Sequence, residues 1–251
     1  MDAQTFAAVM GNSLPAARYQ ALLPAFNACL VQASCTTVNR VAMLVAQVGH
    51  ESLGLKYMHE IWGPTAAQRT YQGRMGNTQP GDGKKYMGHG PLQITGKDNH
   101  AAVSRWAFAH GYVPTATYFV DNPDELAGDR YGFLGVVWYW TVARRMNDYA
   151  DRGDCYGATK AVNGGTNGLA DRTARWRRAL TFGTRLLPTP QEDQLSQQFE
   201  NDARARWPEE DQLDKDTRAD LHAKQIQLDR IEAALALLTK QVAALSVQRQ
   251  G

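Results

Sequence analysis

The chain has 251 residues, 43% hydrophobic and 21% charged, with a formal net charge of +2. This composition is typical of a globular protein with one good-sized core and room for an additional segment. No run of 18 apolar residues occurs, which excludes a membrane-spanning helix and predicts no stable membrane insertion. The N-terminal segment MDAQTFAAVMGNSLPAARYQ lacks the basic start and apolar run of a secretory signal, so we expect synthesis in a cytoplasm.

The charge is uneven along the chain. The first 190 residues hold 19 basic and 13 acidic side chains, whereas the remainder holds 8 and 12. A basic front part suits an anionic polymer, but no nucleic-acid motif accompanies it, so we predict no nucleic-acid partner. Cys29, Cys35 and Cys155 show no C-x-x-C spacing, which favours small buried apolar residues over a metal or redox site. We therefore expect no cofactor and no metal.

Residues 1–187 hold most of the glycines and aromatic residues and predict one compact, mainly helical domain. A strongly apolar helix is expected first, with a break near Gly54, and a glycine-rich and amide-rich region of loops and short strands follows it. Three further helices follow. The expected ranges are 39–50 for the first helix, 55–90 for the loop region, and 130–149, 154–162 and 171–186 for the later helices. The sequence thus predicts a mainly α domain with a small β or loop region.

Residues 188–210 are polar and proline-punctuated, which predicts a linker. Residues 211–251 predict a C-terminal helix, in which apolar residues recur at alternating three- and four-residue steps from Leu228 onward. This spacing favours a short coiled coil and self-association through residues 221–245, although an amphipathic helix folded back on the main domain stays open. The residues are Leu221, Leu228, Ile231, Leu235, Leu238, Val242 and Leu245.

The end of the first predicted helix carries His50 and Glu51. A carboxylate between an apolar helix and a glycine break lies where a cleft can form, and an apolar cleft keeps a carboxyl group protonated, as a glycosidase general acid requires. Taken alone, a plain surface charge is the commoner explanation. A zinc-protease His-Glu-x-x-His motif fails because position 54 is glycine.

Two later segments are rich in groups that bind sugars. Residues 76–100 combine amide and hydroxyl side chains with glycines and aromatics, although a polar surface loop has the same composition. Residues 161–176 contain a tight Asn163-Gly164-Gly165 turn followed by Arg172. An arginine there can orient a catalytic carboxylate or form a routine structural ion pair.

Five separated motifs between about residues 30 and 182 resemble glycoside hydrolase family 19, the chitinase-like enzymes that include many phage endolysins. The resemblance implies an inverting hydrolase with a lysozyme-like α+β fold and a deep cleft. The motifs are Gln47-x-x-His50-Glu51-Ser52-x-Gly54-Leu55, Glu60-Ile61-Trp62-Gly63-Pro64-Thr65, Gly76-Asn77-Thr78-Gln79-Pro80-Gly81-Asp82-Gly83, Gly88-His89-Gly90-Pro91-Leu92-Gln93-Ile94-Thr95-Gly96, and Val162-Asn163-Gly164-Gly165-Thr166-Asn167-Gly168 with Asp171-Arg172.

The resemblance also implies roles for individual residues. Glu51 matches the general acid, and Thr95 matches the hydroxyl that helps to hold the attacking water. The positions expected to bind substrate or to line the cleft are His50, Tyr71, Gln93, Asn99, Asn163 and Arg172.

The general base is open between two positions. Inversion needs a second carboxylate about 6.5–9.5 Å from the first. Related sequences usually have Tyr-Glu-Gly-Arg where this chain has Tyr71-Gln72-Gly73-Arg74, and Gln72 cannot accept a proton at neutral pH. We predict Glu60, nine residues after Glu51, as the second carboxylate. If position 72 is the base site, the chain is impaired, either naturally or by a deliberate substitution.

We expect an endolysin-type enzyme that is made in the host cytoplasm and cleaves β-1,4 linkages in the glycan strands of bacterial peptidoglycan. A missing signal peptide fits phage lysins, which commonly reach the wall after another protein opens the membrane. The alternatives are a chitinase and a catalytically impaired glycan-binding or virion structural module, whose tail would give multivalent attachment.

Overall fold

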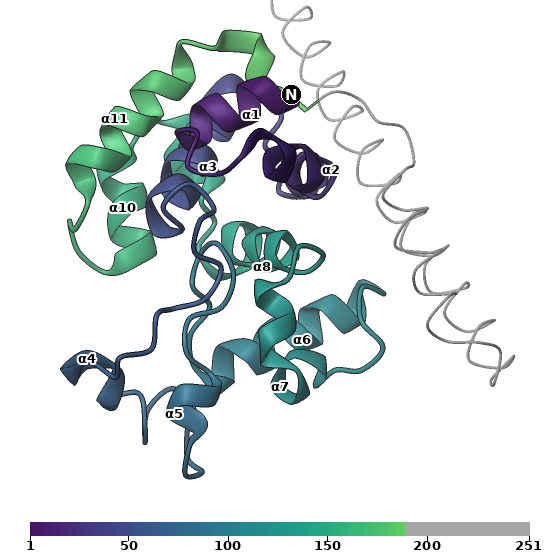
Figure 1. The fold of residues 1–251 in the computed structure, drawn as a ribbon, viewed down its shortest axis with the longest axis vertical. Helices are drawn as coiled ribbons and strands as arrows, with labels where there is room; N and C mark the ends of the chain where they lie inside the picture. The colour runs from purple at the N-terminus through teal and green to yellow at the C-terminus, as the bar shows by residue number, and fades with distance from the viewer. Residues whose placement is uncertain (189–251) are drawn as a thin grey trace, which may run out of the picture. The chain divides into compact units, whose positions relative to one another are not determined.

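The computed structural model describes residues 1–188 (Figure 1). The predicted linker over 188–210, apart from its first residue, and the predicted helix and coiled coil over 211–251 lie outside the described residues. None of the described helices is long and apolar enough to cross a lipid bilayer. The elements are α1 Ala3–Met10, α2 Ala16–Gln32, α3 Val38–Glu51, α4 Ala66–Arg69, α5 Asp82–Lys85, α6 Lys97–Ala109, α7 Tyr118–Asp121, the 3-10 helix η1 Pro123–Ala127, α8 Gly132–Trp138, the π-helix η2 Tyr139–Ala143, α9 Asn147–Asp151, α10 Cys155–Asn163, α11 Leu169–Leu180 and the 3-10 helix η3 Gly183–Leu186.

Helix α3 is the central element of the core. Thr37 caps its first turn by accepting a hydrogen bond from the Arg40 amide, and every residue from Val41 to Gly49 is buried. A helix that is buried all round must be covered on several sides. Helix α11 provides the most extensive of these packings, and α1, α9 and α10 also pack against α3. In Figure 1, α10 and α11 lie with α3 in the upper part, whereas α4, α5, α6 and α7 lie in the lower part.

The mainly helical class is confirmed, and two local expectations are corrected. The region 55–90 contains no strand, only isolated bridges from His59 to His89 and from His89 to Ile94. Many backbone groups there pair with side chains or close turns instead of forming a ladder. The helix expected over 130–149 divides into α8, η2 and α9. It breaks because Arg145 is left-handed (φ 48°) and the Met146 amide donates to the Trp140 carbonyl.

The three cysteines are free and buried, as expected from their spacing. Burial raises the pKa of the Cys35 thiol to about 12, so this thiol stays protonated near neutral pH. The cysteines therefore serve as core residues.

The predicted break at Gly54 is confirmed, because α3 ends at Glu51 and Gly54 takes a left-handed φ of 68°. A Cβ at Gly54 would lie 2.4 Å from the Met10 carbonyl oxygen and 2.3 Å from the Ser13 hydroxyl. The sharp turn thus needs glycine both for its backbone angle and for its close approach to the end of α1.

Replacing Gly54 with alanine is expected to lower the free energy of unfolding by about 3 kcal/mol, since backbone strain and overpacking add. Gly73→Ala is the matched control, because Gly73 is also left-handed (φ 80°) but a Cβ there meets nothing within 4 Å. It should cost about 1 kcal/mol. Urea unfolding of the two variants checks the difference, and equal losses would contradict the close approach at Gly54.

Candidate active site

Glu51 is held at the end of α3 by an arginine from α11. The Arg172 guanidinium donates to the Glu51 carboxylate through Nη2 and to Gln47 Oε1 through Nη1, the latter at 2.6 Å. Gln47 and Glu51 are one turn apart on α3 and therefore share a face. The Arg172 side chain is 1% exposed, whereas Glu51 is 21% exposed. The structure thus fixes Glu51 through a buried cation and leaves its carboxylate partly open to solvent.

His50 is oriented by a second contact between the same helices. Its Nδ1 lies 2.7 Å from Asp171 Oδ2, which also accepts a hydrogen bond from Arg175 Nε. Although burial raises the pKa of Asp171, the bonds from His50 and Arg175 hold it below its usual value. The ring packs on Gly168, where a Cβ would lie 2.1 Å from His50 Nε2. His50 is thus fixed beside Glu51, with its Nδ1 engaged by Asp171.

Glu60 is held by a different part of the fold. Its Oε1 accepts hydrogen bonds from Gln68 Nε2 and the Tyr71 hydroxyl, both at 3.0 Å, and its Oε2 accepts from the Gly88 amide at 2.9 Å. Three donors match the acceptor-only character of an ionised carboxylate. Burial, followed by the nearby Glu60 carboxylate, raises the pKa of Tyr71 to about 12, so its hydroxyl remains a donor. Glu60 is half-buried.

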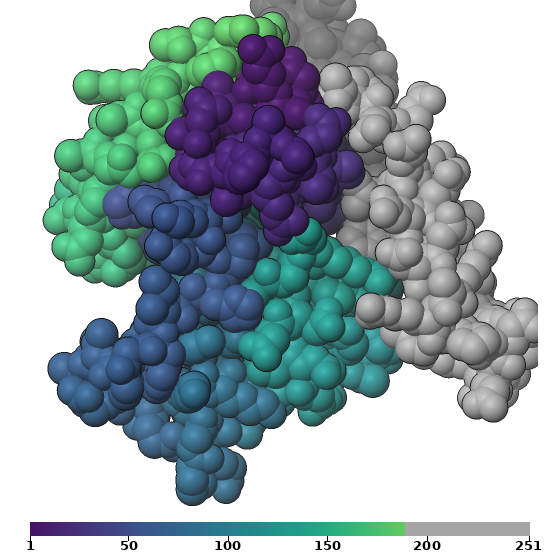
Figure 2. Space-filling model, viewed as in Figure 1, coloured from purple at the N-terminus to yellow at the C-terminus, as the bar shows by residue number. Residues whose placement is uncertain are grey.

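Glu51 and Glu60 are thus carried by separate supports, Glu51 by α3 and α11 and Glu60 by the loops around α4 and residue 88. Figure 2 shows the surface hollowed between the region of α10 and α11 above and the region of α4 and α5 below. The break after α3 lets the chain pass from one side to the other. Two independently held carboxylates are what glycoside hydrolysis uses.

The Gln72 side chain forms hydrogen bonds with the backbone of the loop that contains it. Its Nε2 donates to the carbonyl oxygens of Asn77 and Gln79, at 3.0 and 2.9 Å, and its Oε1 accepts from the Gly83 amide at 3.2 Å. Both donor positions of the amide are therefore occupied by backbone carbonyls. A carboxylate at position 72 would face those two oxygens without a proton to donate.

Two predicted binding residues, Gln93 and Asn99, and the predicted catalytic residue Thr95 lie together after residue 90. Gln93 Nε2 donates to the Gly90 carbonyl, the Thr95 hydroxyl donates to the Gln93 carbonyl, and Asn99 Nδ2 donates to the Thr95 carbonyl. Asn163 lies elsewhere, at the end of α10, where its side chain closes the turn to α11 by bonds to the Asn167 carbonyl and the Gly165 amide. The side chains of Gln93, Thr95 and Asn99 therefore form one group, whereas the Asn163 side chain is held within the turn that leads to α11.

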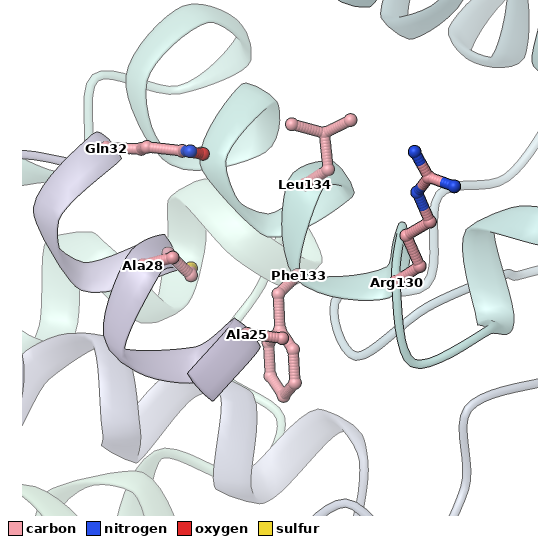
Figure 3. A pocket seen from close by; sticks show the side chains of 7 residues that line it. Ala25, Ala28, Gln32, Arg130, Phe133 and Leu134 are labelled. Atoms are coloured by element: carbon pink, nitrogen blue, oxygen red, sulfur yellow. The ribbon is translucent and has the colours of Figure 1, made fainter. Parts of the chain in front are cut away.

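A small pocket elsewhere on the molecule has none of this chemistry. It lies between α2 and α8 and is lined by Ala25, Ala28, Cys29, Gln32, Arg130, Phe133 and Leu134 (Figure 3). None of the residues expected to be catalytic or to bind substrate lines it. We therefore assign it no part in the site.

A protein of Haemophilus influenzae described as a glycosyl hydrolase family 19 domain-containing protein is 31% identical to the chain over 183 residues. The match covers 61% of this chain and 84% of the relative. The chain belongs to glycoside hydrolase family 19. Membership in this family supports hydrolysis of glycosidic bonds in a glycan. No protein-family model matches the chain.

Other relatives of the chain are chitinases. Chitinase 6 of rice is 31% identical over 129 residues, which cover 49% of this chain and 42% of the relative. The chain thus spans less than half of that chitinase. The crystal structure of chitinase C from Streptomyces griseus superposes with a TM-score of 0.54 at 20% identity, over 75% of this chain and 92% of that one. This likeness confirms the fold.

Gln68 is a residue of the candidate site that the sequence analysis did not single out. It is buried, donates to Glu60, and accepts from the Gly63 and Thr65 amides through Oε1. With Thr65 it forms a capping box at the start of α4. The spacing Thr-x-x-Gln was a readable signal for that helix start, although its link to Glu60 depends on the fold.

Gln72→Glu is expected to lower the free energy of unfolding by about 1–2 kcal/mol without raising activity, since two carbonyl oxygens lose their donor. Gln79→Glu, an exposed glutamine of the same loop, is the matched control and should change stability little. Urea unfolding and glycan hydrolysis measured on both variants check this. A tenfold or greater gain of activity in Gln72→Glu alone would instead identify position 72 as the base site.

Proposed function

We propose that this family 19 chain is an endolysin-type inverting glycoside hydrolase that cleaves β-1,4 linkages between N-acetylated sugars of bacterial peptidoglycan. The observation that carries the proposal is the pair of carboxylates, Glu51 and Glu60, each fixed by its own partners from separate parts of the fold. Glu51 would protonate the leaving glycosidic oxygen, and Glu60 would take a proton from the attacking water.

The two carboxylates are held by different contacts. Glu60 is oriented by hydrogen bonds from Gln68, Tyr71 and Gly88, and its Oε2 accepts one of these bonds, so that oxygen keeps lone-pair capacity for a proton from water. Glu51 is held by a single buried guanidinium and remains 21% exposed, so it can reach a substrate oxygen. The grouped amides and hydroxyl of Gln93, Thr95 and Asn99 are suited to hydrogen bonds with N-acetyl and hydroxyl groups.

The choice of peptidoglycan rests on charge. The first 190 residues carry six more basic than acidic side chains, 19 against 13, and an excess of positive charge attracts an anionic wall polymer. Chitin, which is uncharged, is the second candidate because rice Chitinase 6 and other relatives are chitinases. A glycan-binding module is the third, and it is the candidate that a lost base at position 72 would favour.

The test is the release of reducing ends from purified peptidoglycan and from chitin by the chain and by its Glu51→Gln variant. The proposal expects release from peptidoglycan, abolished in the variant, with the products formed in the inverted anomeric configuration. Release from chitin alone would replace peptidoglycan by chitin as the substrate. Binding to either polymer without release would contradict hydrolysis and favour the binding module.

A further inference from the structure

A cluster of two histidines and a carboxylate includes His59, the residue that precedes Glu60. It consists of His59, His89 and Asp124, and one ligating atom from each lies within 4.8 Å of the others. Asp124 Oδ1 is 3.1 Å from His89 Nε2 and 3.7 Å from His59 Nε2. His89 is fully buried, while His59 and Asp124 are 46% and 83% exposed at their side chains. The cluster is therefore buried at His89 and open to solvent at His59 and Asp124.

A fourth residue, His100, determines which ring nitrogen of His89 carries the proton. His100, also fully buried, places Nδ1 2.9 Å from the Gly96 carbonyl and Nε2 3.2 Å from His89 Nδ1. A carbonyl only accepts, so His100 Nδ1 carries its proton and Nε2 has a lone pair. His89 Nδ1 must then donate to His100. In a neutral ring the other nitrogen, His89 Nε2, is left with a lone pair that points at Asp124.

Two acceptors therefore face each other at 3.1 Å. A lone pair and a carboxylate oxygen repel at that distance unless a positive charge lies between them or beside them. A metal ion satisfies both at once, and a histidine ligand is commonly oriented through its second nitrogen in the way that His100 orients His89. An additional proton on His89 is the competing solution, although charging a fully buried ring costs free energy.

We propose that His59, His89 and Asp124 bind a divalent transition-metal ion of the zinc type. Two nitrogen or oxygen ligands at about 2.0–2.1 Å from a tetrahedral ion lie about 3.3 Å from each other. The 3.1 and 3.7 Å separations from Asp124 bracket that value, and half-exposed His59 has room to close the remaining gap. Two histidines and one carboxylate complete three positions and leave the fourth for water.

The ion would join the chain segments that carry Glu60. The Glu60 amide donates to the Gly88 carbonyl at 2.8 Å, the Gly88 amide returns a bond to the Glu60 carboxylate, and His59 bridges to His89. Adjacent residues of an extended segment point to opposite sides. His59 and Glu60 can thus serve the metal and the cleft from the same stretch of backbone.

The test is calorimetric titration of the untagged chain with Zn²⁺ after chelator treatment, with the melting temperature followed in parallel. The proposal expects one equivalent to bind and the melting temperature to rise. His59→Ala and Asp124→Asn should each weaken binding by about 100-fold, since each removes a ligand. His110→Ala, which removes an exposed histidine outside the cluster, is the matched control and should leave binding unchanged.

Absence of one-equivalent binding would overturn the proposal and leave a protonated His89 paired with Asp124. Binding that survives both His59→Ala and Asp124→Asn would also overturn it. Neither measurement uses glycan hydrolysis, so a failed metal site and a failed hydrolase assignment are distinguishable.

Discussion

Replacing either carboxylate with glutamine is expected to lower kcat by about 10²–10⁴, the usual effect of removing a general acid or base. The two roles can be separated because different conditions should restore the activity of the two variants. Glu51→Gln lacks a proton donor, so it should recover on an aryl glycoside whose leaving group needs no protonation. Glu60→Ala lacks the base, so it should recover with azide, which attacks the anomeric carbon without losing a proton. The azide product must have the inverted configuration.

The matched control is Glu125→Gln, which changes a half-buried glutamate of η1 and should leave kcat unchanged. Rescue of Glu60→Ala by the activated aryl glycoside but not by azide would contradict the base role of Glu60. An unaltered kcat in Glu60→Gln would reduce Glu60 to a support of its loop.

Replacing Arg172 with methionine is expected to cost about 2–4 kcal/mol of folding free energy, somewhat less than a fully buried pair because Glu51 is 21% exposed. The variant leaves Gln47 Oε1 buried without its donor and Glu51 without its cation. Activity should fall as well, since the Glu51 carboxylate is no longer held in one orientation. Urea unfolding and kcat of the refolded variant measure the two effects.

Two further variants make the Arg172 prediction specific. Arg177→Met, on the exposed face of α11, should change stability by less than about 0.5 kcal/mol. The double variant Arg172→Met with Glu51→Gln should be more stable than Arg172→Met alone, because no unpaired carboxylate remains. An Arg172→Met variant as stable as the wild type would show that the buried contact contributes nothing.

The sequence analysis predicted features that depend on short stretches of chain. The apolar run before Glu51 predicts a buried helix, and Gly54 predicts its end, because both are local backbone and burial preferences. The sequence analysis failed where a short stretch of chain carries no local signal. The run 130–149 has no glycine or proline after Gly135 to mark the break between α8 and α9, since that break comes from Arg145 taking a left-handed angle within the folded protein.

By itself, the sequence determined that the chain is a mainly helical family 19 domain with Glu51 at a helix end and Arg172 at the start of a later helix. Only the tertiary structure decided that Arg172 holds Glu51, that the Gln72 amide donates its hydrogen bonds to backbone carbonyls, and that His89 lies beside Asp124. The physical reason is range. Helix formation depends on neighbouring residues, whereas Arg172 and His89 meet partners 121 and 35 residues away that only the packed core brings together. Gln72 meets carbonyls 5 and 7 residues away through the folding of its own loop.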